Sequence, residues 1–210
     1  LGSGRTADGR TDMAYRSGDD FTLLIVCTGN VCRSPAIERL FRSAFAEGSG
    51  ITVHSAGTGA LVGEPIQGPM VQLLEEVGVS ADGFAARAIT EPMVAGADLV
   101  LTATRAHRAD VVEHVPAAVR RTFTVREFAR LASAVDPDEL TAAAGPDARP
   151  AERLAALVPL AARERVQVPA ELDDIVDPYR RSDAVYRESF DQLIEAVRTI
   201  AQVVLGVTQT

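Results

Sequence analysis

The sequence has 210 residues and a formal net charge of −8 at pH 7. Hydrophobic residues make up 47% of it, which is enough for one core, and the length predicts a single domain with room for an insertion. Such an acidic chain is a poor general binder of nucleic acid or of an anionic lipid surface. Any anion that it handles must therefore be held locally, by a loop or by a few arginines.

We expect a soluble, cytoplasmic protein without membrane insertion. The longest purely aliphatic run near the start, Leu23–Val26, is far shorter than the ~20 residues of a spanning helix, and no signal-peptide pattern opens the chain. Two cysteines are too few for a secreted disulfide scaffold. Residues 1–20 have almost no apolar side chains and predict a disordered tail, so the folded domain is expected over 21–210.

The rest of the chain alternates between predicted strands and helices. Buried strands are recognised by short apolar runs, and helices by apolar residues at a spacing of three and four. Ser34 fits the N-cap of the first helix and Pro35 fits its first turn. In chain order we expect a strand at 21–26, a helix from 35, a strand at 51–54, a helix at 70–77, a strand from 98, a helix at 107–115, a strand at 121–125 and a short helix from 126.

Residues 136–170 differ in composition, being rich in alanine, proline and charge. We interpret them as a helical and loop insertion with one helix, Ala151–Arg165, which could gate or shape a neighbouring cleft. The chain then closes with a long helix whose apolar stripe runs from Phe190 to Val204. The alternation of strands and helices predicts an α/β domain built around a parallel sheet.

The segment "VCTGNVCRSP", residues 26–35, carries the clearest chemical signal. A strand, a short turn and a helix place backbone N–H groups around one hollow, and the helix dipole adds positive charge there. Arg33 at the helix entry can grip two oxygens of a bound oxyanion. We expect Cys27, at the end of the strand, to be a thiolate near neutral pH. A thiolate beneath a bound phosphate is a nucleophile placed for in-line attack.

Neighbouring residues of this loop have supporting roles in the prediction. Ser34 can donate its hydroxyl to the Cys27 thiolate, and Asn30 tolerates positive φ and can fix the shape of the loop by hydrogen bonds. Cys32 could trap an oxidised Cys27 as a disulfide. A purely structural cysteine or a metal-binding pair are the alternatives. The combination of a cysteine, an Arg-Ser pair and a proline-capped helix disfavours both, and we predict no metal site.

The reaction also needs a proton donor for the leaving group, and two Asp-Pro steps are candidates. Proline biases the residue before it toward an extended conformation and stiffens the loop. Asp136 opens the insertion and is expected in a turn. Asp177 precedes the last helix and is followed by Tyr179, whose ring can wall a substrate aromatic. We therefore assign Asp177 as the general acid, and as the base toward water in a second step.

These motifs resemble those of the low-molecular-weight protein tyrosine phosphatase family. "CTGNVCRSP" at 27–35 is similar to its N-terminal signature, "DPYR" at 177–180 to its acid loop, and "HSAGTG" at 54–59 to a loop after its second strand. The resemblance covers about 21–130 and 174–204. It implies a single three-layer domain with a four-stranded parallel sheet flanked by helices. It also implies a cysteinyl-phosphate mechanism without metal or cofactor.

The resemblance assigns Cys27 as nucleophile, Arg33 as phosphate clamp and Asp177 as acid, and it makes Asp98 structural. Leu61 would form an aliphatic wall where eukaryotic members carry an aromatic residue, so that Tyr179 contributes more of the contact with a substrate ring. The residues expected to bind phosphate or support the loop are Thr28, Gly29, Asn30, Val31, Cys32, Ser34 and Ser55.

The glycine-rich loop is similar to that of a bacterial branch of the family, which implies a phosphotyrosine protein as partner, with a bacterial tyrosine kinase as one candidate. Phosphoarginine specificity in the family is associated with threonine at the position of Val31. One alternative is an arsenate reductase that needs only Cys27 and an external small thiol, since no cysteine follows Cys32. Another is a non-catalytic binder of phosphotyrosine. We expect His107 and His114 on a solvated helix face.

Overall fold

The computed structural model describes residues 20–207, so the predicted disordered tail lies outside the described residues except for Asp20. The described chain folds around a parallel sheet with the strand order β2-β1-β3-β4. The elements are β1 (Phe21–Cys27), α1 (Arg33–Ala44), β2 (Ile51–Gly57), α2 (Gly68–Glu76), α3 (Glu91–Gly96), β3 (Leu99–Thr102), α4 (Arg105–His114), the 3₁₀ helix η1 (Pro116–Arg121), β4 (Thr122–Thr124), α5 (Val125–Ala134), α6 (Pro137–Ala144), α7 (Pro150–Arg163), α8 (Ala170–Asp173) and α9 (Asp183–Leu205).

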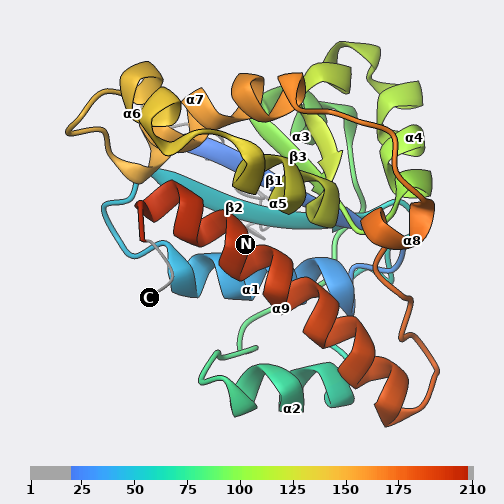
Figure 1. The fold of residues 1–210 in the computed structure, drawn as a ribbon. Coiled ribbons are helices and arrows are strands. Elements are labelled where there is room, and N and C mark those ends of the chain that lie inside the picture. The colour runs from blue at the N-terminus through green and yellow to red at the C-terminus, as the bar shows by residue number, and fades with distance from the viewer. Residues whose placement is uncertain (1–19, 208–210) are drawn as a thin grey trace, which may run out of the picture.

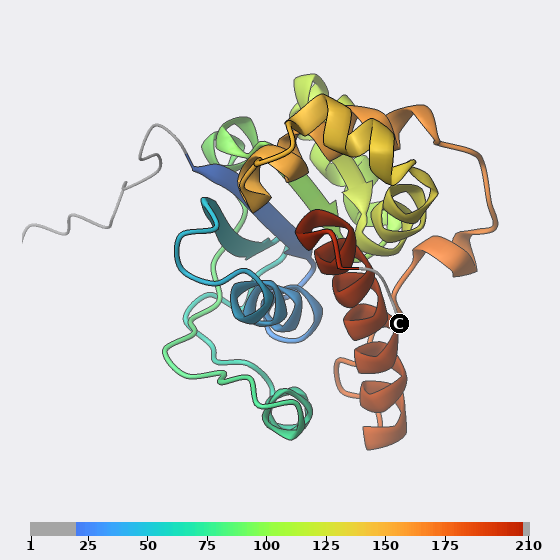
Figure 2. The same ribbon diagram turned by 60° about the vertical axis from the view of Figure 1, so that its left-hand side comes forward.

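The sheet is covered by helices on both faces, which confirms the predicted three-layer α/β fold. Successive side chains of a strand point to opposite faces, and in β1 Leu23 and Ile25 belong to the larger core whereas Leu24 and Val26 belong to the smaller one. Helices α1, α5, α7 and α9 contribute to the larger core, and α3 and α4 to the smaller. Figures 1 and 2 show α1 and α9 together on one side of the sheet and α4 on the other.

The strand order locates a crevice at the carboxyl end of β1. Strand β1 pairs with β2 on one side and with β3 on the other. The chain therefore changes direction across the sheet between the β1–β2 and β3–β4 halves. In open parallel sheets, ligands bind outside the carboxyl ends of the strands at such a switch point. The segment that follows Cys27 lies at this position.

Some local predictions differ from the structure. Helix α1 begins at Arg33, and its N-cap is Cys32, without a side-chain cap. The N-cap prediction for Ser34 is therefore wrong, because its hydroxyl hydrogen-bonds inside the preceding loop. Strand β2 extends to Gly57, beyond the predicted 51–54, since it pairs with β1 to its end.

The segment 136–170 contains two whole helices, α6 and α7, rather than the single predicted helix. Asp136 caps α6 by accepting a hydrogen bond from Asp138 N at 2.8 Å, in keeping with its expected turn role. The N–H of Ala151 donates to Ser49 O at 3.1 Å, and Ser49 shortly precedes β2. Helix α7 thus begins near the amino ends of the strands (Figure 1). Within residues 20–207, no helix is long and apolar enough to cross a membrane.

Candidate active site

The loop from Cys27 to Arg33 turns its carbonyl groups outward. The carbonyl oxygens of Cys27, Thr28 and Gly29 accept hydrogen bonds at 3.0 Å from the N–H groups of Thr58, Gly59 and Leu61, which follow β2. In a trans peptide the N–H points opposite to the C=O. The loop therefore directs its amide N–H groups away from the 58–61 segment and toward the hollow above Cys27.

This close approach of two backbones requires a glycine at the end of β2. A Cβ atom on Gly57 would lie 2.3 Å from Thr28 O and 3.0 Å from Asn30 N, so any larger residue would push the loop away. Asn30 itself adopts a positive φ of 54°, as predicted, and asparagine tolerates that conformation better than most residues. Both residues fix the backbone path on which the N–H groups depend.

A chain of hydrogen bonds beneath the loop ends at the Cys27 thiol. Ser34 Oγ lies 2.9 Å from Cys27 Sγ. Asn30 Nδ2 donates to Ser34 Oγ and to Ser55 Oγ, both at 2.9 Å. Because Ser34 Oγ accepts from the asparagine, its own proton is available to the sulfur. All four residues are buried, and the structure brings together the predicted supports of the loop.

The same network continues to a buried carboxylate that sequence reasoning missed. Ser55 Oγ donates to Glu38 Oε2 at 2.6 Å, and Arg42 pairs with Glu38 Oε1 at 2.9 Å. Glu38 is 1% exposed, so the arginine offsets the cost of burying its charge. Glu38 precedes Arg42 by one helical turn on α1, so the sequence could have indicated their ion pair. It could not have indicated the contact of Glu38 with Ser55 on β2.

Arg33 is buried at the base of the hollow and reaches Asp177. Its side chain is 5% exposed, and its NH2 lies 3.0 Å from Oδ2 of Asp177, which is 54% exposed. Another nitrogen, NH1, donates to Ile175 O at 3.2 Å. Nε is buried and has no hydrogen-bond partner within the described part of the chain. The guanidinium is thus anchored at one edge and retains donors for an oxyanion.

These side chains surround a cavity of about 130 Å³. Most of the predicted site residues line it, and Asn30, Ser34 and Ser55 lie behind the loop. Residues 136–170 contribute no lining residue to this cavity, so the expected shaping of the cleft by the insertion is not seen there. The lining residues are Cys27, Thr28, Gly29, Val31, Cys32, Arg33, Gly59, Leu61, Asp177 and Tyr179.

The two cysteines have different surroundings, and both are free thiols. Cys32 Sγ lies 3.6 Å from the hydroxyl of buried Tyr186 on α9. Burial raises the pKa of Cys32 to about 12, so this thiol stays protonated at neutral pH. Cys27 instead lies beside a serine hydroxyl at the bottom of the N–H-lined hollow. The environment therefore points to Cys27 rather than Cys32 as the reactive thiol.

The prediction that His107 lies on a solvated helix face is wrong. His107 is 7% exposed, with Nε2 at 2.8 Å from Thr28 Oγ1 and Nδ1 at 2.8 Å from Thr104 Oγ1. The segment around His107 is rich in arginine and alanine. Because such a polar sequence does not indicate a buried helix face, the packing of α4 against the loop could not be predicted from it. His114, the last residue of α4, is exposed as expected.

The buried His107 predicts a loss of stability in acid. Burial, and secondarily the charge of Arg33, lower the pKa of His107 below its ordinary value of 6.5. The unfolded chain therefore binds more protons below about pH 6.5, and the free energy of unfolding falls as the pH falls through that range. His54 has a lowered pKa for the same first reason. We expect the Tm of His107→Gln to fall less than that of the wild type between about pH 7.5 and pH 5.5.

The exposed His114 supplies the matched control. The variant His114→Gln should retain the full wild-type decrease in Tm, which thermal denaturation at both pH values measures. If His107→Gln and the wild type lost equal amounts of stability in acid, protonation of His107 would not be coupled to folding.

The segment before Asp177 is fixed by a second ionic cluster that the sequence did not indicate. The carboxylate of Asp173 is 4% exposed and pairs with Arg105 of α4 at 2.5 Å and with Arg130 of α5 at 3.2 Å. The N–H of Arg105 also donates to Asp174 Oδ1 at 2.8 Å. Further along, Ile175 N donates to Ala103 O at 2.9 Å. These contacts tie the chain to α4, α5 and the end of β3 just before it enters the cavity.

Comparison with known proteins agrees with this geometry. The family model "Low molecular weight phosphotyrosine protein phosphatase" matches residues 22–140. The chain is 34% identical over 116 residues to the low molecular weight protein-tyrosine-phosphatase Etp of Escherichia coli, covering 55% of this chain and 76% of that protein. It is 26% identical over 181 residues to a protein-arginine-phosphatase of Bacillus subtilis, covering 86% of this chain and 94% of that protein.

Solved structures give the same picture for the whole fold. The low molecular weight protein tyrosine phosphatase from T. tengcongensis superposes with a TM-score of 0.61 at 26% identity. The match covers 86% of this chain and 97% of the other. Its extent includes the segment after residue 140, which lies beyond the family-model match.

Proposed function

This chain belongs to the low molecular weight phosphotyrosine protein phosphatase family and is a phosphatase, and we propose that it hydrolyses phosphotyrosine in proteins through a phosphorylated Cys27. The observation that carries the proposal is the buried Arg33, whose Nε has no partner within the described residues and which lines one cavity with Cys27 and Asp177. A phosphate placed above the sulfur would supply the missing acceptor.

In the first step the Cys27 sulfur attacks the phosphorus in line with the ester oxygen. The S–P bond forms while the P–O bond to the leaving group breaks, and Asp177 transfers its proton to the departing oxygen. The N–H groups of the loop and the Arg33 guanidinium hold the other phosphate oxygens, where negative charge is spread in the transition state. Binding of the phosphate to Arg33 would release Asp177 from its ion pair.

In the second step water attacks the phosphorus of the phosphorylated cysteine. Asp177, now ionised, accepts a proton from that water, the S–P bond breaks, and inorganic phosphate leaves. Ser34, whose Oγ lies 2.9 Å from the sulfur, donates a hydrogen bond to the departing thiolate and makes it a better leaving group. The same serine is held in place by Asn30.

The walls of the cavity favour an aromatic substrate. Val31, Leu61 and Tyr179 line it together with the catalytic groups, and such side chains pack on a phenyl ring. A phosphoarginine substrate is the second candidate, because the Bacillus subtilis relative is a protein-arginine-phosphatase. In the family, threonine at the position of Val31 is associated with phosphoarginine specificity. Here the planar, charged guanidinium of phosphoarginine would meet the aliphatic side chain of Val31 instead.

The assay that tests the proposal compares matched peptides carrying phosphotyrosine or phosphoarginine at one position, without added metal. We expect kcat/KM for phosphotyrosine to be at least about tenfold higher. Reduction of arsenate in the presence of a small thiol is measured in parallel. Faster hydrolysis of phosphoarginine, or arsenate reduction without hydrolysis of either peptide, would contradict the proposal.

Asp173 is expected to act as a positioning residue for Asp177. Replacing it with asparagine removes the charge held by Arg105 and Arg130, and the acid loop loses its fixed position. We expect Asp173→Asn to lower kcat/KM for phenyl phosphate by about tenfold, because a misplaced acid protonates a basic leaving group poorly. Dinitrophenyl phosphate, whose leaving group needs no proton, should be hydrolysed at nearly the wild-type rate.

Two free thiols suit a reducing compartment, and we propose a cytoplasmic site of action on a phosphotyrosine protein such as a bacterial tyrosine kinase. We also propose that residues 21–210 act as one domain in which 136–170 is an insertion. Its helix α7 supports the larger core, away from the cavity.

A further inference from the structure

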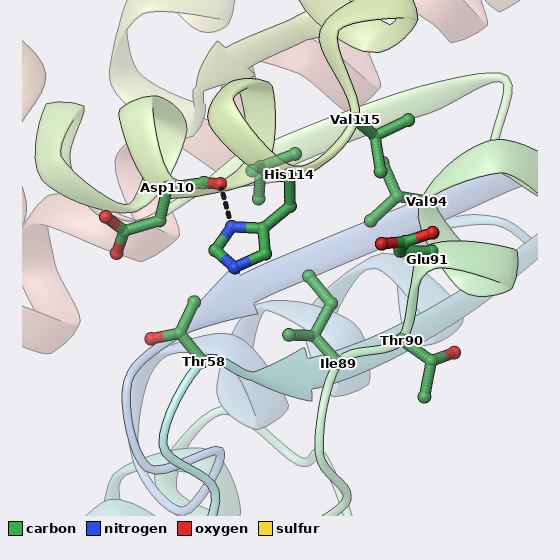
Figure 3. A pocket seen from close by; sticks show the side chains of 9 residues that line it. Thr58, Ile89, Thr90, Glu91, Val94, Asp110, His114 and Val115 are labelled. Atoms are coloured by element: carbon green, nitrogen blue, oxygen red, sulfur yellow. Dashed lines mark hydrogen bonds between the residues drawn. The ribbon is translucent and has the colours of Figure 1, made fainter.

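A second and larger pocket, of about 440 Å³, lies beside the catalytic cavity. Its floor is formed by Ile89, Val94, Val111 and Val115, which extend the smaller core of the sheet. These walls come from the segment before α3, from α3 itself and from the C-terminal end of α4 (Figure 3). The pocket is large enough for a long side chain.

Several polar groups around this floor can accept hydrogen bonds, and the hydroxyls of Thr58 and Thr90 can both accept and donate. His114 Nδ1 lies 2.7 Å from the carbonyl oxygen of Asp110, and since a carbonyl only accepts, Nδ1 carries the proton. In Figure 3 the other ring nitrogen, Nε2, faces Thr58 and Ile89 across the pocket. The carboxylates of Glu91 and Asp110 complete the rim.

The charge of the rim is left uncompensated by the protein. Among residues 20–207, no arginine lines the pocket, and neither Glu91 nor Asp110 forms an ion pair. Other carboxylates of this chain, such as Glu127 and Asp173, are paired with arginines. An apolar floor beneath two carboxylates suits a side chain with an aliphatic stem and a cationic, donor-only head.

Two consecutive residues connect this pocket with the catalytic cavity. Thr58 lines the larger pocket and Gly59 lines the catalytic cavity, and the N–H of Thr58 donates to Cys27 O at 3.0 Å. Consecutive residues are about 3.8 Å apart, and an extended peptide advances about 3.3 Å per residue. A substrate chain with its phosphotyrosine in the catalytic cavity can therefore place a nearby side chain in this pocket.

We propose that this pocket is a subsite for an arginine or lysine side chain within three residues of the phosphotyrosine. The inference rests on the proposed phosphotyrosine hydrolysis and adds the sequence preference of the same enzyme. The aliphatic stem packs on Val94 and Val111, and the cationic head meets the Glu91 and Asp110 carboxylates. Charge pairing at a partly exposed rim selects among substrates more than it adds affinity.

The test uses phosphotyrosine peptides with a single arginine at each of the three positions on either side, each matched by a citrulline peptide of equal shape without charge. We expect kcat/KM at one position to be about fivefold higher for arginine than for citrulline. The double variant Glu91→Gln/Asp110→Asn should bring that ratio to one. The matched control Glu113→Gln, an exposed glutamate of α4 outside the pocket, should keep it.

Because the measure is a ratio within each variant, changes in basal activity cancel. Equal rates for arginine and citrulline at every position would overturn the inference alone, provided the peptides are hydrolysed. A ratio that persists in the double variant would also overturn it, since another carboxylate would then read the charge. Failure to hydrolyse both the peptides and p-nitrophenyl phosphate would instead overturn the proposed function and, with it, the subsite.

Discussion

Replacing Cys27 with serine is expected to lower the turnover of p-nitrophenyl phosphate by at least about 10⁴-fold. A serine hydroxyl is a far weaker nucleophile than a thiolate, and it leaves the phosphorylated intermediate poorly. The N–H groups of the loop and Arg33 are unchanged by the substitution. Binding of inorganic phosphate, followed as an increase in Tm, should therefore persist while steady-state turnover is lost.

Cys32→Ser is the matched control for this substitution. Its thiol contacts Tyr186 at 3.6 Å, and burial raises its pKa to about 12, so we expect less than about a tenfold loss of turnover. The opposite result, in which Cys32→Ser is inactive and Cys27→Ser retains turnover, would assign the nucleophile to the other cysteine.

Asp177→Asn is expected to lower kcat/KM for phenyl phosphate by about 10²- to 10³-fold, because phenoxide is basic and needs a proton as it leaves. Dinitrophenyl phosphate should lose less than about tenfold, since its leaving group is stable as an anion. Asparagine keeps the size of the side chain, so the change removes the proton donor and the ion pair with Arg33. Steady-state kinetics with both substrates measures the difference.

The other Asp-Pro step provides the control. Asp136 caps α6 and does not line the catalytic cavity. Asp136→Asn should therefore leave kcat/KM for phenyl phosphate and for dinitrophenyl phosphate near the wild-type values. An equal loss with both substrates in Asp177→Asn would point to disturbed binding or folding rather than to lost proton transfer.

The loop from Cys27 to Arg33 could be predicted from the sequence because its geometry is local. A buried strand, a turn with Asn30 at positive φ and a helix within a few residues fix the directions of Cys27 and Arg33. Asp177 is far along the chain, but its Asp-Pro-Tyr context and the resemblance to a family indicated that it lies beside this loop, where the structure has it. The parallel three-layer fold followed from the alternation of strands and helices, whose buried runs are strongly apolar.

The contacts of His107 and Asp173 could not be predicted because they depend on tertiary packing. The polar sequence around His107 is typical of a solvated helix, yet α4 packs this side against Thr28. Asp173 and its two arginines belong to different helices, and no local pattern joins them. Ser34 fits an N-cap by its position alone, but its hydroxyl contacts Asn30 and Cys27 instead, and the helix begins one residue earlier, at Arg33.

The phosphorylated cysteine is the central claim, and rapid-quench mass spectrometry tests it most directly. The enzyme is mixed with p-nitrophenyl phosphate, stopped in acid within the first turnover and digested. We predict a burst of one p-nitrophenol per active site and one phosphoryl group on the peptide that contains Cys27. Neither should appear in Cys27→Ser within the time of the first wild-type turnover. Steady hydrolysis without a burst, with no phosphoryl group on that peptide in either the wild type or Asp177→Asn, would contradict a covalent mechanism at Cys27.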